Sequence, residues 1–188
     1  MRELKKHNFS KVFDLQNSSR TNFYKNILFP KADKIIWSSS ITTLPLDKNK
    51  KEFDKKSVLE RFDHQLQESG LNTSNTLKPN FGWASTDINK IKNFYKLDKY
   101  ILLFPFCSPH LAIKKWPYYN NLIEKITNKY GKKYKIVTAP GPNEINDAKN
   151  VNAIALLDNG RALDVSQLTS LIKGSSFVIA NDTGPAHM

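Results

Sequence analysis

The stretch most able to do chemistry is residues 176–188, where an apolar run is followed at once by polar and turn-forming residues. Residues 177–180 are typical of a buried parallel strand, and residues 181–183 place an amide, a carboxylate and a hydroxyl at its carboxyl end. Gly184 lets the backbone approach a ligand closely, and Pro185 suits the first turn of a helix. Because free N–H groups at a helix N-terminus attract anions, this stretch predicts an anion-binding turn.

Two earlier loops carry further candidate groups. Residues 106–117 offer the Ser108 hydroxyl and, just before an expected helix, Lys114 and Lys115. A cation is unfavourable there unless an anion lies beside it, which favours diphosphate binding over the alternative of two solvated lysines. Glu144 stands at the expected start of a short helix, where a carboxylate either caps the helix or accepts hydrogen bonds from ribose hydroxyls.

Composition limits the class of protein. The chain has 188 residues, of which 39% are hydrophobic, so it can bury a core. Its net charge of +12 suggests nucleic acid, a phosphorylated ligand or an anionic lipid surface as partner, or simply a solvated basic surface. The single Cys107 cannot form an internal disulfide and is expected to pack rather than react. Because no apolar run approaches the ~20 residues that span a bilayer, we expect a soluble, cytoplasmic protein.

The elements that must position these loops alternate in the second half of the chain. The expected strands are residues 100–104, 134–138, 153–157 and 177–180, and the expected helices are residues 117–130 and 165–174. The second helix is marked by Val165, Leu168, Leu171 and Ile172 and should be capped near Asp164 and closed by Gly174. Strands separated by helices need crossover connections, so the pattern predicts a doubly wound parallel α/β sheet with its ligand at the carboxyl ends of the strands.

The first half of the chain is less regular. The expected elements are strands at residues 11–15 and 34–37, a helix from about Ser19, and an amphipathic helix at residues 57–69 that buries Val58, Leu59, Phe62 and Leu66. Residues 71–82 have linker composition. We therefore expect a partial N-terminal domain with its linker at residues 1–82 and a ligand-binding domain at residues 83–188, the chain being truncated at both ends.

Three motifs together resemble a known family. Ser108-Pro-His with Lys114-Lys-Trp-Pro117, then Pro140-Gly-Pro-Asn-Glu144, then residues 181–187 occur in the order and spacing of the C-terminal half of glycosyltransferase family nine, the lipopolysaccharide heptosyltransferases. Residues 12–20 are similar to the end of that family's acceptor domain. The resemblance implies a GT-B fold, in which a Rossmann-like donor domain follows an α/β acceptor domain, and an inverting transfer of heptose from ADP-heptose to the lipopolysaccharide inner core.

The resemblance also implies roles on the phosphate side of the donor. Ser108 and the backbone at Thr183 and Gly184 are expected to hold the diphosphate. Lys114 is expected to neutralise the diphosphate or to touch the sugar, and His187 to complete the phosphate side, although a histidine at that place could equally pack or cap its helix.

Three further roles concern the rest of the donor. Glu144 is expected to bind the ribose, Asp182 to orient the heptose hydroxyls and Leu163 to lie near the adenine. The general base belongs to a segment that precedes this chain in the family, so no catalytic residue is assigned, and Asp14 is a candidate by its position alone.

The implied partners are a nucleotide-sugar donor and a lipid A and inner-core acceptor, met at the inner face of the inner membrane by a peripheral, monomeric enzyme. No tightly bound cofactor is expected, and a divalent metal is permitted but not required. The fragment alone is expected to be inactive. A non-catalytic nucleotide-sugar-binding module is the alternative, and nucleic-acid binding is disfavoured because the sequence shows no recognisable motif for it.

Overall fold

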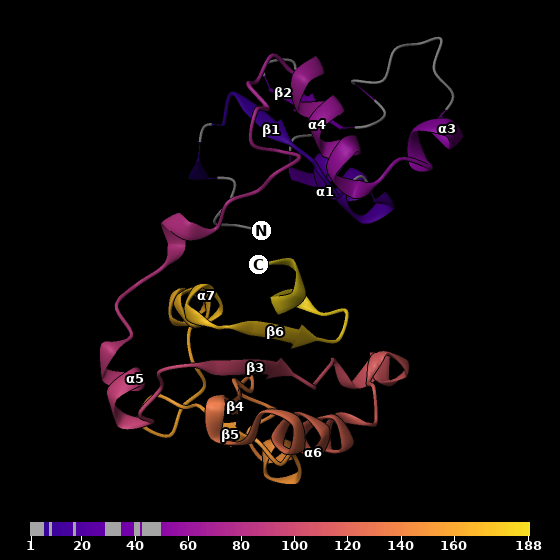
Figure 1. Ribbon diagram of the computed structural model, residues 1–188. Coiled ribbons are helices and arrows are strands. Elements are labelled where there is room, and N and C mark those ends of the chain that lie inside the picture. Colours follow the sequence, from indigo (N-terminus) through magenta and orange to yellow (C-terminus); the bar gives the residue numbers. More distant parts are fainter. Residues whose placement is uncertain (1–5, 8, 17, 29–34, 40–41, 43–49) are drawn as a thin grey trace. The chain divides into compact units, whose positions relative to one another are not determined.

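A computed structural model describes residues 6–7, 9–16, 18–28, 35–39, 42 and 50–188. The chain divides into two compact units, Met1–Asn80 and Phe81–Met188 (Figure 1). Each unit has a parallel sheet of its own. In the described part of the chain, no helix is long and apolar enough to cross a membrane.

The sheet of the second unit has four strands in the order β5-β4-β3-β6, and all of its neighbouring pairs are parallel. The strands are β3 (Tyr100–Phe104), β4 (Lys135–Thr138), β5 (Ile154–Ala155) and β6 (Phe177–Ala180). Figure 1 shows the arrows of β3 and β6 side by side and pointing the same way. The predicted parallel α/β architecture is therefore confirmed.

Helices cover both faces of this sheet. The helices are α5 (Asn89–Phe94), α6 (Tyr119–Tyr130) and α7 (Val165–Gly174). All five residues of β3 are buried, and they alternate between two hydrophobic clusters. Leu102 packs in a cluster with residues of α5 and α7, whereas Leu103 packs with Tyr119 and Ile123 of α6. Since successive side chains of a strand point to opposite faces, the central strand anchors both layers of a doubly wound, Rossmann-like unit.

The two longer helices end where their sequences indicate, with small differences. Asp164 caps α7 through a capping box with Gln167, and Gly131 ends α6 with a φ of 58° that favours glycine. Of the four apolar residues that mark α7 in the sequence, Val165 is not part of the core, because it is 68% exposed. Thr169 is buried instead, since its hydroxyl donates to the Val165 carbonyl at 2.8 Å and so remains hydrogen-bonded.

Strand β6 is an edge strand rather than the buried strand that its apolar run predicts. Among the residues that the structure describes it pairs with β3 alone, and 59% of Phe177 and 39% of Val178 are exposed. A short apolar run does not distinguish an edge from a central position, because both bury at least one face.

Two helices expected at the site are replaced by tighter turns. The helix that should begin at Glu144 is a series of turns followed by a 3₁₀ helix at Asp147–Asn150, and the helix after Gly184 is a 3₁₀ helix at Gly184–His187. Glu144 therefore lies inside a turn, where its N–H donates to the Gly141 carbonyl at 2.9 Å. The two prolines and the glycine of residues 140–144 favour such turns over an α-helix.

The first unit pairs β1 (Lys11–Phe13) with β2 (Ile36–Ser38), and it contains α1 (Ser19–Leu28), α3 (Lys50–Asp54) and α4 (Val58–Glu68). The strand expected at residues 34–37 starts at Lys34, which lies outside the described residues.

Helix α4 buries only part of the face predicted, since Phe62 and Leu66 are half-buried on the same side as Gln65. Val58 and Leu59 are exposed, while Gln65 is fully buried and its amide donates to the carbonyls of Asp14 and Ser38 at 3.1 and 3.2 Å. A polar residue faces the sheet because the strand ends offer it carbonyl partners. Residues 71–80, which follow α4, contain neither helix nor strand.

Candidate functional site

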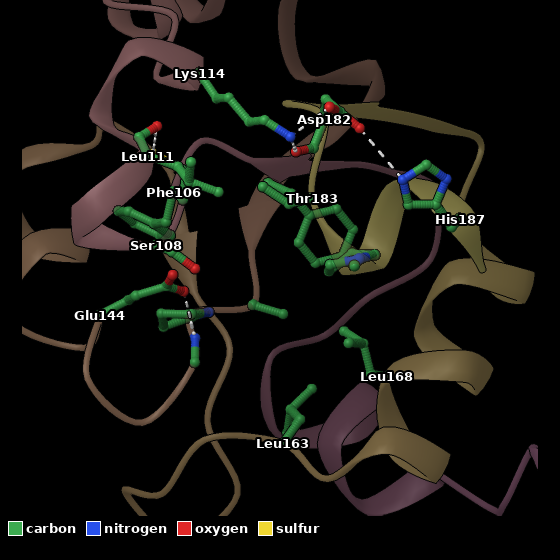
Figure 2. A pocket seen from close by; sticks show the side chains of 17 residues that line it. Phe106, Ser108, Leu111, Lys114, Glu144, Leu163, Leu168, Asp182, Thr183 and His187 are labelled. Carbon is green, nitrogen blue, oxygen red and sulfur yellow. Dashed lines mark hydrogen bonds and ion pairs between the residues drawn. The ribbon is translucent and has the colours of Figure 1, made fainter. Parts of the chain in front are cut away.

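A cavity of about 490 Å³ opens at the carboxyl ends of β3, β4 and β6 (Figure 2). Its walls come from the loops that leave these strands and from the start of α7. All eight residues assigned to substrate binding from the sequence line it, namely Ser108, Lys114, Glu144, Leu163, Asp182, Thr183, Gly184 and His187. The parallel sheet brings together loops that lie up to 79 positions apart, from 108 to 187, since carboxyl ends of parallel strands meet at one edge.

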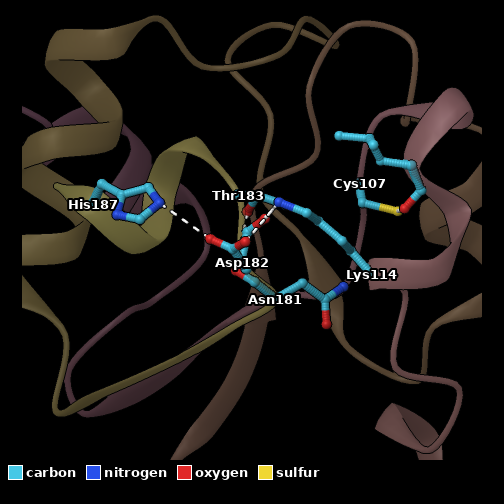
Figure 3. A network of polar contacts seen from close by, with 7 residues as sticks. Cys107, Lys114, Asn181, Asp182, Thr183 and His187 are labelled. Carbon is cyan, nitrogen blue, oxygen red and sulfur yellow. Dashed lines mark hydrogen bonds and ion pairs between the residues drawn. The ribbon is translucent and has the colours of Figure 1, made fainter. Parts of the chain in front are cut away.

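A lysine and a histidine flank one carboxylate at the rim of this cavity. The Lys114 Nζ lies 2.6 Å from Asp182 Oδ2, and His187 Nε2 lies 3.3 Å from Asp182 Oδ1 (Figure 3). The hydrogen bond and the charge of Lys114, followed by those of His187, lower the pKa of Asp182 from its ordinary value. The sequence predicted a bound diphosphate beside Lys114, and this stays a prediction, because the anion beside Lys114 in the structure is the Asp182 carboxylate.

Asn181 holds the loops after β3 and β6 against each other. It is buried, and its Nδ2 donates to the Pro105 carbonyl at 2.9 Å. Its Oδ1 accepts from the Trp116 N–H at 3.4 Å and from the Tyr119 hydroxyl at 3.3 Å. The sequence analysis placed the Asn181 amide with the carboxylate and the hydroxyl of residues 182 and 183 near the ligand. In the structure this amide instead forms hydrogen bonds within the protein and supports the cavity wall.

Glu144 enters the cavity from the β4 side. One of its carboxylate oxygens accepts a hydrogen bond from the Gly141 N–H at 2.8 Å. A Cβ at Gly141 would lie 3.2 Å from the same oxygen, so the absence of a side chain permits this close approach. A carboxylate can accept about four hydrogen bonds, and Glu144 therefore keeps the capacity to accept bonds from a ligand hydroxyl.

The charged side chains at the cavity rim and two leucines of its lining lie on different sides. Figure 2 shows Leu163 and Leu168 together, on the far side of the cavity from Lys114 and Asp182, with Glu144 at a third side. The sequence assigned Leu168 to the core because it lies on the apolar face of α7. Leu168 also lines the cavity. The apolar periodicity did not predict this, because the face of a helix that packs on the sheet can also line a cavity in the first turn.

Phe106, Cys107 and Leu111 also line the cavity and were not assigned to it from the sequence. The Cys107 thiol donates to the Leu111 carbonyl at 3.4 Å, which ties down the 3₁₀ helix at Pro109–Lys114. Lys115, the neighbour of Lys114, is exposed and does not line the cavity. The described residues contain no group of three or more His, Cys, Asp or Glu side chains placed to hold a metal ion.

Comparison with known proteins agrees with this geometry. The family model described as glycosyltransferase family 9 (heptosyltransferase) matches residues 1–188, the whole chain. Searches of curated proteins and of solved structures gave no match. The match extends the resemblance seen in three motifs to both units, and the parallel α/β sheets agree with a Rossmann-like GT-B architecture. The chain therefore belongs to glycosyltransferase family 9, the heptosyltransferase family.

Proposed function

We propose that this glycosyltransferase binds ADP-heptose in the cavity of its second unit and transfers the heptose, with inversion, to the inner core of lipopolysaccharide. Members of the family act on a nucleotide-sugar donor and an acceptor. The observation that supports ADP-heptose is the division of one cavity into an apolar end, at Leu163 and Leu168, and a charged end, at Lys114, Asp182 and His187. An adenine ring needs apolar surface, and a sugar diphosphate needs charged and polar groups.

The size and the chemistry of the cavity agree with this donor. About 490 Å³ lies within the range of ligand pockets, roughly 300–1,000 Å³. We place the adenine against the two leucines, the ribose hydroxyls at Glu144 and the diphosphate beside Ser108, Lys114 and the backbone of residues 183–184. His187 then completes the phosphate side.

Transfer breaks the bond between the anomeric carbon and the diphosphate oxygen, and negative charge builds on the leaving ADP. A preorganised ammonium and backbone N–H groups stabilise that charge. Since Lys114 already pairs with Asp182, we propose that the diphosphate takes over Lys114 and that the Asp182 carboxylate accepts hydrogen bonds from the heptose hydroxyls. No tightly bound cofactor is needed for these steps, and a divalent metal is permitted.

The acceptor hydroxyl attacks the opposite face of the anomeric carbon and gives its proton to a general base. We assign no residue to this base. Asp14, the candidate suggested by position, is buried at the carboxyl end of β1, so it is not proposed for the role. The acceptor is proposed to be lipid A with its inner core, reached by a monomeric enzyme that binds peripherally to the inner face of the inner membrane.

Calorimetric titration of ADP and ADP-heptose into the purified chain tests the donor site. We expect both to bind, and we expect Lys114→Met to weaken the affinity for both about tenfold or more, because a hydrogen bond to a charged group contributes about 1.5–3 kcal/mol. Lys115→Met is the matched control, since it removes the same charge one residue away and outside the cavity. A folded chain that binds neither ligand at millimolar concentration, or equal losses in the two variants, would contradict the proposal.

A further inference from the structure

The hydroxyl of Tyr119 is buried at the place where β3 and β6 end. Tyr119 is the first residue of α6, and only 5% of it is exposed. Its hydroxyl lies 3.3 Å from the Phe104 carbonyl oxygen and 3.3 Å from Asn181 Oδ1. Phe104 is the last residue of β3, and Asn181 directly follows β6. The single hydroxyl hydrogen is therefore shared between the backbone of one strand and a side chain at the end of the other.

The ring and the hydroxyl of Tyr119 have separate effects. The ring packs in the hydrophobic cluster that contains Leu103 of β3 and Ile123 of α6, and a phenylalanine ring would fill the same place. Burying a hydroxyl costs free energy unless it is hydrogen-bonded, so packing alone does not account for it. Burial also raises the pKa of the Tyr119 hydroxyl, which therefore keeps its hydrogen at physiological pH. The partners of the hydroxyl indicate what it does instead.

The two chain segments that meet at this hydroxyl carry the charged pair of the cavity. Asn181 directly precedes Asp182, and Trp116 follows Lys114 by two residues. The Trp116 N–H donates to Asn181 Oδ1 at 3.4 Å. The Trp116 ring also meets the Tyr119 ring edge-on, with centroids 5.2 Å apart. Figure 3 shows Lys114 and Asp182 together beside Asn181, so Tyr119 contacts both segments just behind the ion pair.

We propose that Tyr119 is a positioning residue, whose hydroxyl acts through Asn181 to hold Lys114 where the donor diphosphate binds. This inference rests on the proposed function, because it concerns the same donor site. Lys114 ends the 3₁₀ helix at Pro109–Lys114, whose backbone is non-helical at Leu111. A 3₁₀ helix is held less well by its own hydrogen bonds than an α-helix is. The loop therefore depends on anchors outside it, and the hydrogen bonds of Asn181 provide one just after Lys114.

Tyr100 offers a comparison that separates this role from a purely structural one. Tyr100 is also buried in the second unit, and its hydroxyl donates to the Leu171 carbonyl at 2.6 Å. It stands at the amino end of β3, whereas Phe104 stands at the carboxyl end beside the cavity. Two buried tyrosine hydroxyls thus donate to backbone carbonyls of the same unit, one close to the charged pair and one remote from it.

Calorimetric titration of ADP into the whole chain and its variants tests the proposal. In Tyr119→Phe we expect the affinity for ADP to fall about threefold to tenfold, since one lost hydrogen bond changes an equilibrium constant by about that factor. In Tyr100→Phe, the matched control, the affinity should stay within about twofold, because the substitution is remote from the cavity. Urea unfolding should show a loss of stability in both variants. Equal losses of affinity in the two variants, or no loss in Tyr119→Phe, would overturn the proposal.

A double variant tests whether Tyr119 acts through Lys114. Added to Lys114→Met, the Tyr119→Phe change should weaken ADP binding by less than about twofold, because the ammonium group that the hydroxyl positions is already absent. Losses that multiply in the double variant would mean that Tyr119 acts independently of Lys114, and the positioning role would be wrong.

The titration of the Asp182 carboxyl group, followed by carboxyl-carbon NMR, gives a readout without any ligand. Lys114, followed by His187, lowers the pKa of Asp182. If Lys114 is displaced, this pKa should rise toward its ordinary value of 3.8 in Tyr119→Phe, and it should not change in Tyr100→Phe. An unmodified chain that binds no ADP would contradict the proposed function, and the Asp182 titration would still decide the positioning role. The same Asp182 titration in Tyr119→Phe and in the unmodified chain would refute that role.

Discussion

At the scale of single residues, the ion pair between Lys114 and Asp182 governs the charge of the candidate site. The neighbouring ammonium and His187 lower the pKa of Asp182, so the carboxylate stays ionised at all physiological pH values. A depressed carboxyl pKa means that the ion pair is intact above that pKa and is lost only as the pH falls through it. The pair should therefore persist into more acid solution than an unpaired aspartate allows.

Removing the lysine tests this coupling. In Lys114→Met the pKa of Asp182 should rise toward its ordinary value of 3.8, because Lys114 is the largest cause of the shift. In His187→Gln the rise should be smaller, since the histidine is the weaker partner. A carboxyl-carbon NMR titration measures both changes. An Asp182 titration that is the same in all three proteins would show that the ion pair does not form in solution.

Neutralising the Asp182 carboxylate should change the affinities for ADP and for ADP-heptose by different amounts. In Asp182→Asn we expect ADP to bind severalfold more tightly, because Lys114 no longer has a competing anion and the diphosphate meets no like charge. ADP-heptose should gain less or lose affinity, because the proposed contacts of the carboxylate with the sugar are weakened. Calorimetry with both ligands measures the ratio of affinities. An unchanged ratio would remove Asp182 from the sugar site.

The residue types at the site were predictable from sequence, but their pairing was not. Ser108, Glu144 and Thr183 stand in loops at strand ends, and the topology alone brings such loops together. The bond between Lys114 and Asp182 joins residues 68 positions apart. The partner of the Lys114 ammonium group depends on side-chain rotamers and on loop conformation. Neither can be predicted from the spacing of residues in the sequence.

At the scale of elements, helices and strands with clear capping residues or apolar patterns were predicted from the sequence, and short elements without them were not. The bounds of β3 and β6 agree with the sequence prediction, and Ser57 and Asp164 form the capping boxes of α4 and α7. The two short helices α3 and α5 were missed, because five or six residues are too few to show a helical period. The predicted strand at residues 153–157 shrinks to the two residues of β5, since its pairing with β4 covers only that length.

Tyr100 connects the central strand to α7. Its buried hydroxyl donates to the Leu171 carbonyl at 2.6 Å, and burial raises its pKa to about 12. Tyr100→Phe should lower the free energy of unfolding by about 1 kcal/mol, because the variant leaves a buried carbonyl without its donor. Urea unfolding followed by circular dichroism measures this loss, with Tyr118→Phe, on an exposed tyrosine, as the control.

The same tyrosine predicts a pH dependence. A raised pKa means that the neutral hydroxyl stabilises the fold fully below pH 10, the ordinary tyrosine value. This contribution is lost as the pH rises from there through about 12. The difference in stability between the unmodified chain and Tyr100→Phe should therefore be constant at neutral pH and shrink in strong alkali. A constant difference up to pH 12 would show that Tyr100 ionises normally.

At the scale of the whole molecule, the division into Met1–Asn80 and Phe81–Met188 has a direct experimental consequence. Residues 71–80 contain no helix or strand, and most of their side chains are exposed. Within residues 50–188, a protease of broad specificity should cut there first, because the chain can enter a protease only where its backbone is accessible.

Mass spectrometry of the early fragments identifies the first cuts, and a fragment beginning near Phe81 should still bind ADP, because it contains the complete cavity. Early cuts inside the sheet of the second unit would mean that its strands open more readily than the connecting segment. Sequence composition had already indicated a linker at residues 71–82, since clusters of Asn, Ser, Thr and Pro seldom form regular elements.

The buried amide of Asn181 limits how the cavity can rearrange. Its hydrogen bonds with Pro105, Trp116 and Tyr119 connect two of the three loops that line the cavity. We expect any induced fit around a nucleotide to come chiefly from the third loop, residues 139–146. The hydrogen bond between Gly141 and Glu144 lies within this loop. We therefore expect slow amide hydrogen exchange at residue 181, and exchange that changes with ligand near residue 144.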